Sequence, residues 1–529
     1  MPTLEWIGKE KVINHHQDVP YRVLERQYSY DEQGQHAEDN GSENMIIHGD
    51  NLEALKSLLP RYEGKIKCIY IDPPYNTGNE GWVYNDNVND PKIRKWLGEV
   101  VGKEGEDLSR HDKWLCMMYP RLKLLYKLLD DEGVIFISID DIEYANLKLV
   151  CDEIFGSNCF ASNVSWQRTY ASRNDSKGIS NAVEHVLVYS KQPNWNPNRL
   201  PRTAEMNAKY GNPDNDISEW RTDNAFAPGA STHQGMVYAI QNPFTGKMIY
   251  PGNARCWTFG QEQTIEIMRG WCEYELRVLD DANQRAMVCG VSVDKVKKDV
   301  PGIVLSKSLE ESKEKATEVL NRGQWPRYYF TKGGKGGIAK KTYLNSVGGR
   351  APTNFWSYSE AGHTDEAKKE MLSIFNGRAT FDTPKPCRLL EFVLSVAGDE
   401  NTLILDSFAG SGTTAHAVLN MNKADGGNRK FILIEMMDYA DSITAERVKR
   451  VIKGYGEDKK AVPGTGGNFS YYELGEPLMI GDNLNEAVGA DKIREYIWFT
   501  ETKENFQNPN ADKPYYLGST AQTGYYFFL

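Results

Sequence analysis

A rigid polar corner, Asp72-Pro73-Pro74-Tyr75, directly follows an apolar, strand-like run that ends at Ile71. The Asp72 carboxylate and the Pro73 carbonyl are hydrogen-bond acceptors, and the proline rings fix φ so that both acceptors face one point. An exocyclic amino group on a nucleobase is a poor nucleophile because its lone pair is delocalised into the ring. Two acceptors that hold its N–H bonds would favour a pyramidal nitrogen, while Tyr75 offers a face on which an extruded base can stack. The corner therefore predicts activation of a base amino group; a proline-terminated strand with a satisfied aspartate is the alternative.

A second motif, "LILDSFAGSGTTAHAV", spans residues 403–418. It predicts a strand that ends at Asp406, a turn that contains Gly410 and Gly412, and a helix that starts near Thr413. Glycine allows positive φ and close approach of a ligand, and a helix N-terminus offers unpaired N–H groups. A triphosphate loop is excluded because no G-K-[ST] follows, and the third glycine of the dinucleotide fingerprint is absent. The motif indicates a nucleotide-type cofactor corner, with an ordinary tight turn as the alternative.

An acidic residue supports the cofactor interpretation. Glu435 ends the next predicted strand, 29 positions after Asp406. A carboxylate there can accept hydrogen bonds from both ribose hydroxyls of a cofactor that lies across the strand ends. Taken alone, Glu435 could equally be a solvated carboxylate at a strand end.

Strand and helix patterns alternate around both motifs. A strand within 44–48, a helix over 52–59 and a second strand lead to Asp72. The next helix is predicted by apolar residues at helical spacing, which are Leu115, Met118, Leu122, Leu125 and Leu129, and the strands "GVIFISID" and "VEHVLVYSK" follow. This alternation predicts an α/β sheet, in which ligands bind at the carboxyl ends of the strands.

The alternation is interrupted once. From about residue 193 to 375 the chain is rich in polar loops, tryptophan, tyrosine and glycine clusters, and the strand-helix pattern then returns. We predict an N-terminal arm (1–43), a first half of the α/β domain (44–192), an inserted α+β domain (193–375), a second half (376–460) and a C-terminal segment (461–529). The final run "TGYYFFL" predicts an exposed strand that a partner or a second copy would cover.

Composition narrows the class of protein. Of the 529 residues, 40% are hydrophobic and 26% charged, and no apolar run approaches the roughly 20 residues that span a bilayer. The start lacks the order of a secretory signal, so we expect a cytoplasmic protein. The eight cysteines are scattered without zinc spacing, which predicts reduced thiols and no metal site.

The inserted region carries a different charge from the rest. The net charge of -11 argues against wholesale coating of nucleic acid, yet residues 201–350 hold 21 Lys and Arg against 17 Asp and Glu. Within them, residues 321–350 contain seven basic residues and no acidic one, with aromatic residues interleaved. Basic groups of this kind contact phosphates, and the predicted DNA-binding residues are Arg322, Arg327, Lys332, Lys335, Lys340 and Lys341. A flexible solvated loop is the alternative.

The two corners together resemble the amino-methyltransferases that act on DNA with S-adenosylmethionine. D-P-P-Y precedes F-x-G-x-G, which is the circularly permuted order of the β class. The segments "YIDPPYNTGNE", "GVIFISIDD", "VEHVLVYSK", "WSYSEAGHTDEAKKE" and "FDTPKPCRLLEFVL" further resemble the modification (Mod) subunits of type III restriction-modification systems. The resemblance runs from about Asn44 to near the C-terminus.

The resemblance implies a fold and a set of site residues. The fold would be a Rossmann-like, mostly parallel, seven-stranded methyltransferase sheet with an inserted target recognition domain, and the reaction methyl transfer to N6 of a flipped adenine. Asp at the first position of the tetrapeptide favours adenine over cytosine. The implied catalytic residues are Asp72, Pro73, Pro74 and Tyr75, and the implied cofactor-binding residues are Asp50, Thr383, Pro384, Lys385, Asp406, Phe408, Gly410, Ser411, Gly412 and Glu435.

The resemblance also implies partners. These are double-stranded DNA, a second copy of the chain in a homodimer, and a separate restriction (Res) helicase-nuclease subunit. Two other interpretations stay open on the residues alone: an adenine methyltransferase without a nuclease partner, and a non-catalytic DNA specificity subunit that retains the fold.

Overall fold

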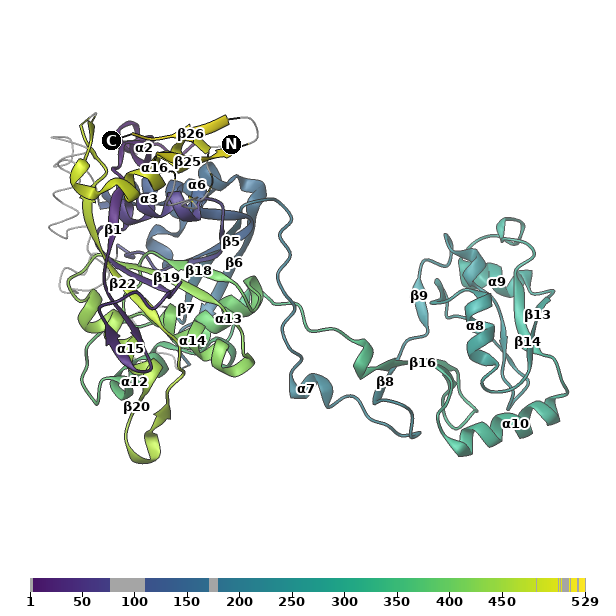
Figure 1. The fold of residues 1–529 in the computed structure, drawn as a ribbon. Coiled ribbons are helices and arrows are strands. Elements are labelled where there is room, and N and C mark those ends of the chain that lie inside the picture. The colour runs from purple at the N-terminus through teal and green to yellow at the C-terminus, as the bar shows by residue number, and fades with distance from the viewer. Residues whose placement is uncertain are drawn as a thin grey trace. The chain divides into compact units, whose positions relative to one another are not determined.

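The computed structural model describes residues 3–76, 110–170, 179–481, 483–502, 504, 506, 513, 515–520 and 523–528. The chain divides into two compact units (Figure 1). The first combines residues 1–198 with 351–529, and the second is residues 199–350. The inserted unit is thus shorter at both ends than the predicted span of 193–375.

An eleven-stranded sheet forms the centre of the first unit. Its order is β17 (Phe355–Trp356), β6 (Phe160–Gln167), β7 (Val183–Ser190), β5 (Leu129–Ile139), β4 (Ile66–Ile71), β18 (Leu403–Asp406), β19 (Lys430–Glu435), β3 (Met45–His48), β22 (Phe469–Pro477), β1 (Arg22–Asp31) and β2 (Gly34–His36). The six strands from β5 to β22 are all parallel to one another. The prediction of a mostly parallel α/β sheet is confirmed.

The sheet has eleven strands rather than the seven that were predicted. Two of the additional strands, β1 and β2, come from the region taken as an N-terminal arm, and β22 comes from the predicted C-terminal segment. β17 pairs with β6 at the other edge, which places the end of the predicted insert in the first unit. β1 pairs with β22 and β17 pairs with β6, segments far away in the chain, and local sequence does not reveal such pairing.

Helices cover both faces of the sheet (Figure 1). One face carries α3 (Asn51–Tyr62), α5 (Arg110–Leu128) and α6 (Asp141–Phe155), and the other carries α13 (Cys387–Ala397), α14 (Thr413–Asp425) and α15 (Glu446–Lys453). Because side chains alternate along a strand, Ile69 and Ile71 of β4 point to one face, where they share a core cluster with Trp114 of α5. No helix in the described ranges is long and apolar enough to cross a bilayer.

The second unit has α+β composition. A four-stranded sheet, β11 (Met248–Ile249), β10 (Ile240–Gln241), β14 (Pro301–Leu305) and β13 (Tyr274–Val278), is accompanied by α8 (Gln261–Met268), α9 (Ala282–Cys289) and α10 (Leu309–Arg322). A three-stranded sheet follows the order β15 (Tyr328–Phe330), β16 (Ile338–Tyr343) and β8 (Trp220–Asp223). The aromatic residues of the basic stretch pack into this core: Tyr328, Tyr329 and Phe330 are all buried.

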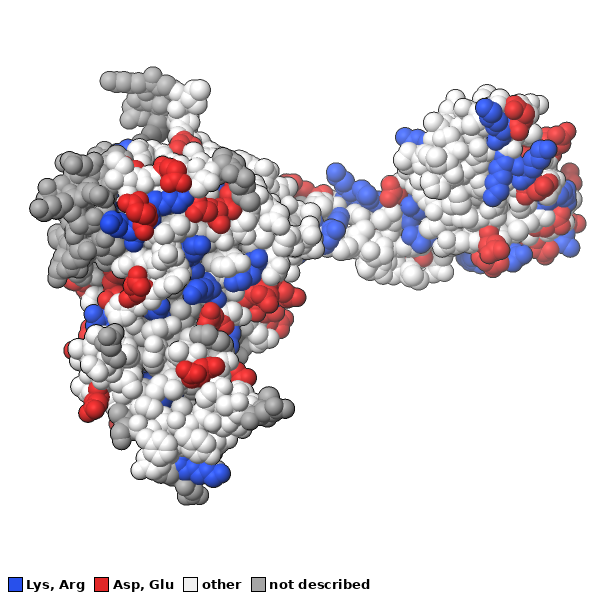
Figure 2. Space-filling view, turned by 90° about the horizontal axis from the view of Figure 1, so that it is seen from above, with Lys and Arg blue, Asp and Glu red and all other residues white. Residues whose placement is uncertain are grey.

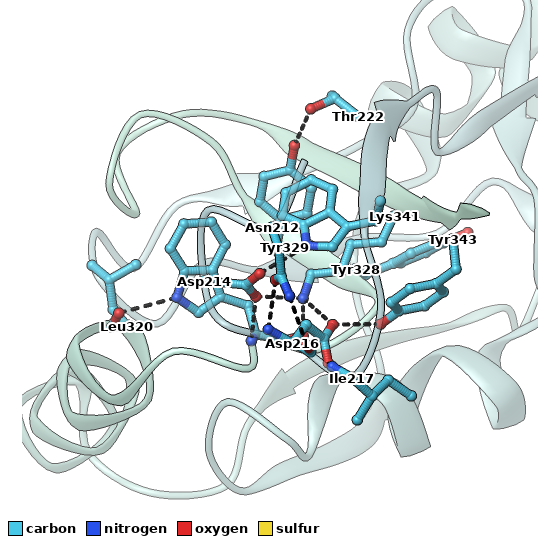
Figure 3. Close-up of polar contacts among 12 residues, drawn as sticks. Asn212, Asp214, Asp216, Ile217, Thr222, Leu320, Tyr328, Tyr329, Lys341 and Tyr343 are labelled. Atoms are coloured by element: carbon cyan, nitrogen blue, oxygen red, sulfur yellow. Dashed lines mark hydrogen bonds and ion pairs between the residues drawn. The ribbon is translucent and has the colours of Figure 1, made fainter. Parts of the chain in front are cut away.

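Lys341 on β16 corrects one of the predicted DNA contacts. Its side chain is fully buried, and its ammonium forms ion pairs with Asp214 and Asp216 (Figure 3). The ammonium also donates to the Trp325 carbonyl oxygen at 2.7 Å. A lysine whose charge is held by two carboxylates inside the protein cannot reach a phosphate, so the prediction for Lys341 is wrong. Its acidic partners lie more than 100 residues earlier in the chain, outside the stretch that suggested the contact.

The other predicted DNA contacts lie at the surface. Arg322, Arg327, Lys332 and Lys335 are exposed, and Lys340 is half-buried. On the face of the molecule that Figure 2 shows, Lys and Arg are interspersed with Asp and Glu. All eight cysteines are buried and unpaired, in accord with the expectation of reduced thiols.

Candidate active site

The two sequence motifs meet at one edge of the sheet. β4 and β18 are parallel neighbours, with Ile404 opposite Cys68 and Leu405 opposite Ile69. Their carboxyl ends therefore lie side by side, although more than 330 residues separate Asp72 from Asp406. A pocket at this edge is lined by residues of both corners, among them Asp72, Lys385, Asp406, Phe408, Gly410 and Ser411. Thr383 and Pro384 of the predicted cofactor set line it too.

Asp72 is held by two donors. Lys385 Nζ donates to Asp72 Oδ2 at 2.6 Å, and Tyr75 Oη donates to Asp72 Oδ1 at 2.8 Å. Burial raises the pKa of Asp72, and the Lys385 ammonium opposes that rise. For Lys385 burial acts to lower the pKa, but the nearby Asp72 and Glu184 carboxylates outweigh it and raise the pKa above the ordinary value. The sequence predicts Lys385 beside the cofactor; its side chain reaches Asp72, and its carbonyl oxygen accepts from Thr413 Oγ1 at 3.2 Å.

Hydrogen bonds with residues of α5 and α6 hold the corner in place. The Pro74 carbonyl accepts a hydrogen bond from Trp114 Nε1 at 2.7 Å. Asn76 adopts a left-handed φ of 59°, and its side-chain Nδ2 donates to Oε1 of the fully buried Glu143. Among the described residues, no backbone N–H donates to the Pro73 carbonyl oxygen. Sequence reasoning missed Trp114 and Glu143, because neither lies in a recognisable motif.

Tyr75 makes more contacts than a free stacking platform would. Besides Asp72, its hydroxyl contacts Glu184 Oε2 at 3.2 Å and accepts from Lys385 Nζ at 2.9 Å. The Lys385 ammonium lies 5.0 Å from the ring centroid of Tyr75. Stacking of a base on Tyr75 remains a prediction.

The glycine turn has the backbone that its sequence predicted. Gly410 and Gly412 have φ values of 52° and 82°, and α14 begins at Thr413. A Cβ atom on Gly412 would lie 3.0 Å from the Thr444 carbonyl oxygen. Asp406 accepts hydrogen bonds from the Phe408 amide at 3.1 Å and from the Thr414 hydroxyl. Asp406 thus holds the turn in place from within the protein.

Glu435 reaches the same turn from β19. Its Oε2 accepts from the Gly410 amide at 2.8 Å, and its Oε1 accepts from the Met437 amide at 3.0 Å. Burial raises the pKa of Glu435 to about 7, and burial also raises the pKa of Asp406 to about 7. The nearby Asp72 and Glu435 carboxylates also act to raise the pKa of Asp406.

Asp50 lies next to this edge as the N-cap of α3. Its carboxylate accepts from the Leu52 amide at 2.8 Å and lies 3.4 Å from Arg121 Nη2. The neighbouring Gly49 amide donates to the Glu435 carbonyl at 3.0 Å. The structure therefore brings together the predicted residues of both corners, with Asp50 two residues beyond the end of β3 and Glu435 at the end of the neighbouring strand β19.

Comparison with known proteins identifies the family. The model of the DNA methylase family matches residues 66–446, which is most of the chain and includes both corners. The chain belongs to the DNA methylase family. The chain is 33% identical over 472 residues to the type III restriction-modification enzyme StyLTI Mod subunit of Salmonella typhimurium, a match that covers 83% of this chain and 62% of the relative.

Other relatives include a second type of enzyme. The type II methyltransferase M.KpnI of Klebsiella pneumoniae is 29% identical over 411 residues, which are 75% of this chain and 81% of that protein. A solved structure, the cytosine-N4-specific PvuII DNA methyltransferase, matches with a TM-score of 0.34 and 13% identity, over 77% of this chain and 86% of that one. The chain spans less than two thirds of the length of the StyLTI Mod subunit.

Arg447 on α15 supports the glycine turn, and sequence reasoning missed it. The guanidinium is fully buried, and its Nη1 donates to Ser411 Oγ at 2.9 Å and to Thr413 Oγ1 at 2.7 Å. Its Nη2 contacts Glu370 Oε2 at 2.9 Å, Cys387 Sγ at 3.3 Å and His416 Nδ1 at 3.1 Å. These last three atoms have the spacing of a metal site. The guanidinium already lies among them, so the cluster is an arginine site that holds the turn.

Substitution of Gly412 tests the turn. Gly412→Ala is expected to destabilise the protein by about 1–2 kcal/mol and to weaken cofactor binding, because a left-handed residue acquires a Cβ against the Thr444 carbonyl. Gly426, at the other end of α14, has a φ of 74° and nothing within 4 Å of its Cβ position. Gly426→Ala is therefore the control, because it adds the cost of a left-handed φ without a steric contact. Urea unfolding and calorimetric titration of both variants check the prediction. Equal losses of cofactor affinity in Gly412→Ala and Gly426→Ala would contradict it.

Substitution of Glu435 tests its raised pKa. An acid whose pKa is about 7 in the folded state and about 4.3 in the unfolded chain binds more protons when folded, so stability falls as pH rises between those values. Glu435→Gln removes this loss. We expect the variant to be more stable than the parent at pH 8, by about 1–3 kcal/mol, but not at pH 4, and to bind cofactor about 10-fold more weakly.

The matched control is Glu473→Gln. Glu473 is exposed on β22 and faces His48 from one side, as Glu435 does from the other. Urea unfolding at several pH values should show a flattened pH dependence for Glu435→Gln alone. An unchanged slope would disprove the assignment of the pH dependence to Glu435.

Proposed function

We propose that this chain transfers a methyl group from S-adenosylmethionine to N6 of an adenine extruded from double-stranded DNA. It would act as the modification and specificity subunit of a type III restriction-modification system. One observation carries the proposal: the Asp72 corner and the glycine turn line one pocket, and Lys385 contacts both. An amine and a methyl donor bound at these corners would be adjacent.

The residues on the β18 side fit the proposed cofactor. A Cβ on either glycine would meet a neighbouring atom at 3.0–3.2 Å in addition to straining the positive φ, so the turn favours glycine. The buried Ser407 hydroxyl at the start of the turn has no hydrogen-bond partner among the described residues. Glu435 and Asp50 provide carboxylates for ribose and adenine groups, and Thr383 and Pro384 lie where the methionine end would bind. When bound, S-adenosylmethionine supplies an electrophilic methyl group on a positively charged sulfur.

The residues on the β4 side fit the amine. The Asp72 carboxylate and the Pro73 carbonyl would accept the two N–H bonds of the adenine amine and orient its lone pair. The nitrogen gains positive charge as it is methylated, and an adjacent carboxylate stabilises that charge. Asp72 would then take the proton that the nitrogen sheds. Catalysis therefore rests on position and electrostatics and requires no covalent enzyme intermediate.

The second unit would recognise the target. Arg322, Arg327, Lys332, Lys335 and Lys340 remain the proposed phosphate contacts, since their charges reach the surface. The similarity to a type III Mod subunit supports a separate Res subunit as partner. A homodimer and a cytoplasmic location, where duplex DNA is accessible, complete the proposal. Light scattering that gives a monomer mass at micromolar concentration would contradict the homodimer.

A second candidate function is a methyltransferase without a nuclease partner. The match to the type II methyltransferase M.KpnI favours it, because that match covers 81% of the relative's length. The chemistry at Asp72 is the same in both cases. Co-purification of a helicase-nuclease with the tagged chain from its native cells distinguishes them.

Long-read mapping of modified bases tests the reaction itself. DNA from cells that express the chain is expected to carry N6-methyladenine at one sequence motif, and DNA from cells that express Asp72→Ala should carry none. A modified cytosine would overturn the choice of base, and an unmodified genome in the presence of folded protein would overturn the activity.

A further inference from the structure

Glu184 is a buried carboxylate that the proposed reaction has not used. It lies near the start of β7, opposite Trp166 of β6, and its side chain is 7% exposed. Arg168 Nη1 donates to its Oε1 at 2.7 Å, and the Tyr75 hydroxyl contacts its Oε2 at 3.2 Å. A buried carboxylate costs free energy unless it is paired and hydrogen-bonded. We therefore ask what Glu184 does beside Asp72 and Tyr75.

Four charges balance at this corner. Asp72 and Glu184 are acidic, and Lys385 and Arg168 are basic. Lys385 is the cation shared by the two acids: its Nζ lies 2.6 Å from Asp72 Oδ2 and 3.7 Å from Glu184 Oε2. The ammonium thus lies near both acids and closer to Asp72.

The position of Lys385 conflicts with the proposed chemistry. An ammonium at hydrogen-bond distance withdraws electron density from the Asp72 carboxylate and makes it a poorer acceptor for the amine. A fixed positive charge also repels the positive charge that develops on the nitrogen as it is methylated. The corner would therefore be more reactive with the ammonium displaced from Asp72.

We infer that Glu184 is a positioning residue that draws the Lys385 ammonium off Asp72 when the target amine reaches that carboxylate. The inference rests on the proposed methyl transfer. Glu184 acts through Lys385 and does not touch the base. The exchange keeps both carboxylates hydrogen-bonded: Lys385 moves to Glu184, and the amine N–H takes its place at Asp72. Arg168 holds Glu184 in position from the opposite side.

A double-mutant cycle tests the coupling. The readout is single-turnover methyl transfer from tritium-labelled S-adenosylmethionine to unmethylated plasmid DNA. Glu184→Gln is expected to slow transfer at least about 10-fold, with KM for cofactor and DNA within about threefold of the parent. The transfer rate of Lys385→Met is the reference for the double variant. Because Glu184 matters only while Lys385 carries a charge, the double variant should transfer methyl groups as fast as Lys385→Met alone.

The outcomes separate this inference from the proposed function. No transfer by the parent protein would overturn both. If the parent transfers methyl groups but the rate losses of Glu184→Gln and Lys385→Met multiply in the double variant, the inference alone is overturned. An effect of Glu184→Gln that is confined to KM would overturn it too. Thermal unfolding checks that each variant folds. Should Glu184→Gln fail to fold, the cycle uses Glu184→Asp, which keeps the charge but moves it away from Lys385, and the same outcomes decide.

Discussion

Asp72→Asn is expected to lower the rate of methyl transfer by about 10³-fold. The asparagine keeps one carbonyl acceptor but loses the negative charge, so it can neither stabilise the cationic nitrogen nor take its proton. It also leaves Lys385 with Glu184 as its nearest carboxylate, at 3.7 Å. Single-turnover transfer of a labelled methyl group measures the loss.

Binding of the cofactor should survive this substitution. The side-chain bonds of Asp72 go to Lys385 and Tyr75, whereas Glu435 and the glycine turn are held by separate bonds. We expect the dissociation constant for S-adenosylmethionine to change less than about threefold, because no uniform binding interaction is lost. Asp382→Asn is the control, since Asp382 is exposed in the segment that precedes Lys385. An Asp72→Asn variant that retains more than a tenth of the parent rate would contradict the catalytic assignment of Asp72.

Lys341→Met is expected to destabilise the second unit by about 3–5 kcal/mol. The methionine fills a similar volume, but Asp214, whose side chain is fully buried, loses its cation. Burial acts to raise the pKa of Asp216, and hydrogen bonds from Lys341 and Tyr343 bring it below the ordinary value. Removal of the lysine therefore leaves two carboxylates with neutral hydrogen-bond donors but without their cation (Figure 3).

The neighbour Lys340 is the matched control. It is half-buried on the same strand, and its ammonium lies 5.9 Å from the Phe259 ring. Lys340→Met should change stability by less than about 0.5 kcal/mol and weaken DNA binding, most clearly at low salt. Urea unfolding of the whole chain, with hydrogen exchange of peptides from 199–350, gives the two stabilities. Equal stabilities for the two variants would contradict the structural role of Lys341.

The sequence by itself determined the elements that carry the site. The apolar run before Asp72 forms β4, which ends at Ile71, and the run before the glycine turn forms β18, which ends at Asp406. The helix after the turn starts at Thr413 as expected, and Asp50 caps α3. These features follow from local causes: side-chain periodicity, the φ freedom of glycine and the capping capacity of a short acidic residue.

Only the tertiary structure decided which charges meet. Lys341 belongs to a stretch without acidic residues, which predicts a surface position. Its acidic partners, Asp214 and Asp216, lie 127 and 125 residues away. Lys385 joins Asp72 across 313 residues, and Glu184 joins Tyr75 across 109. No local pattern encodes such pairs, because burial of an ion pair depends on which distant strands and loops pack together. The periodicity of a segment specifies its own backbone, whereas the partner of a buried charge is specified by the packing of the whole unit.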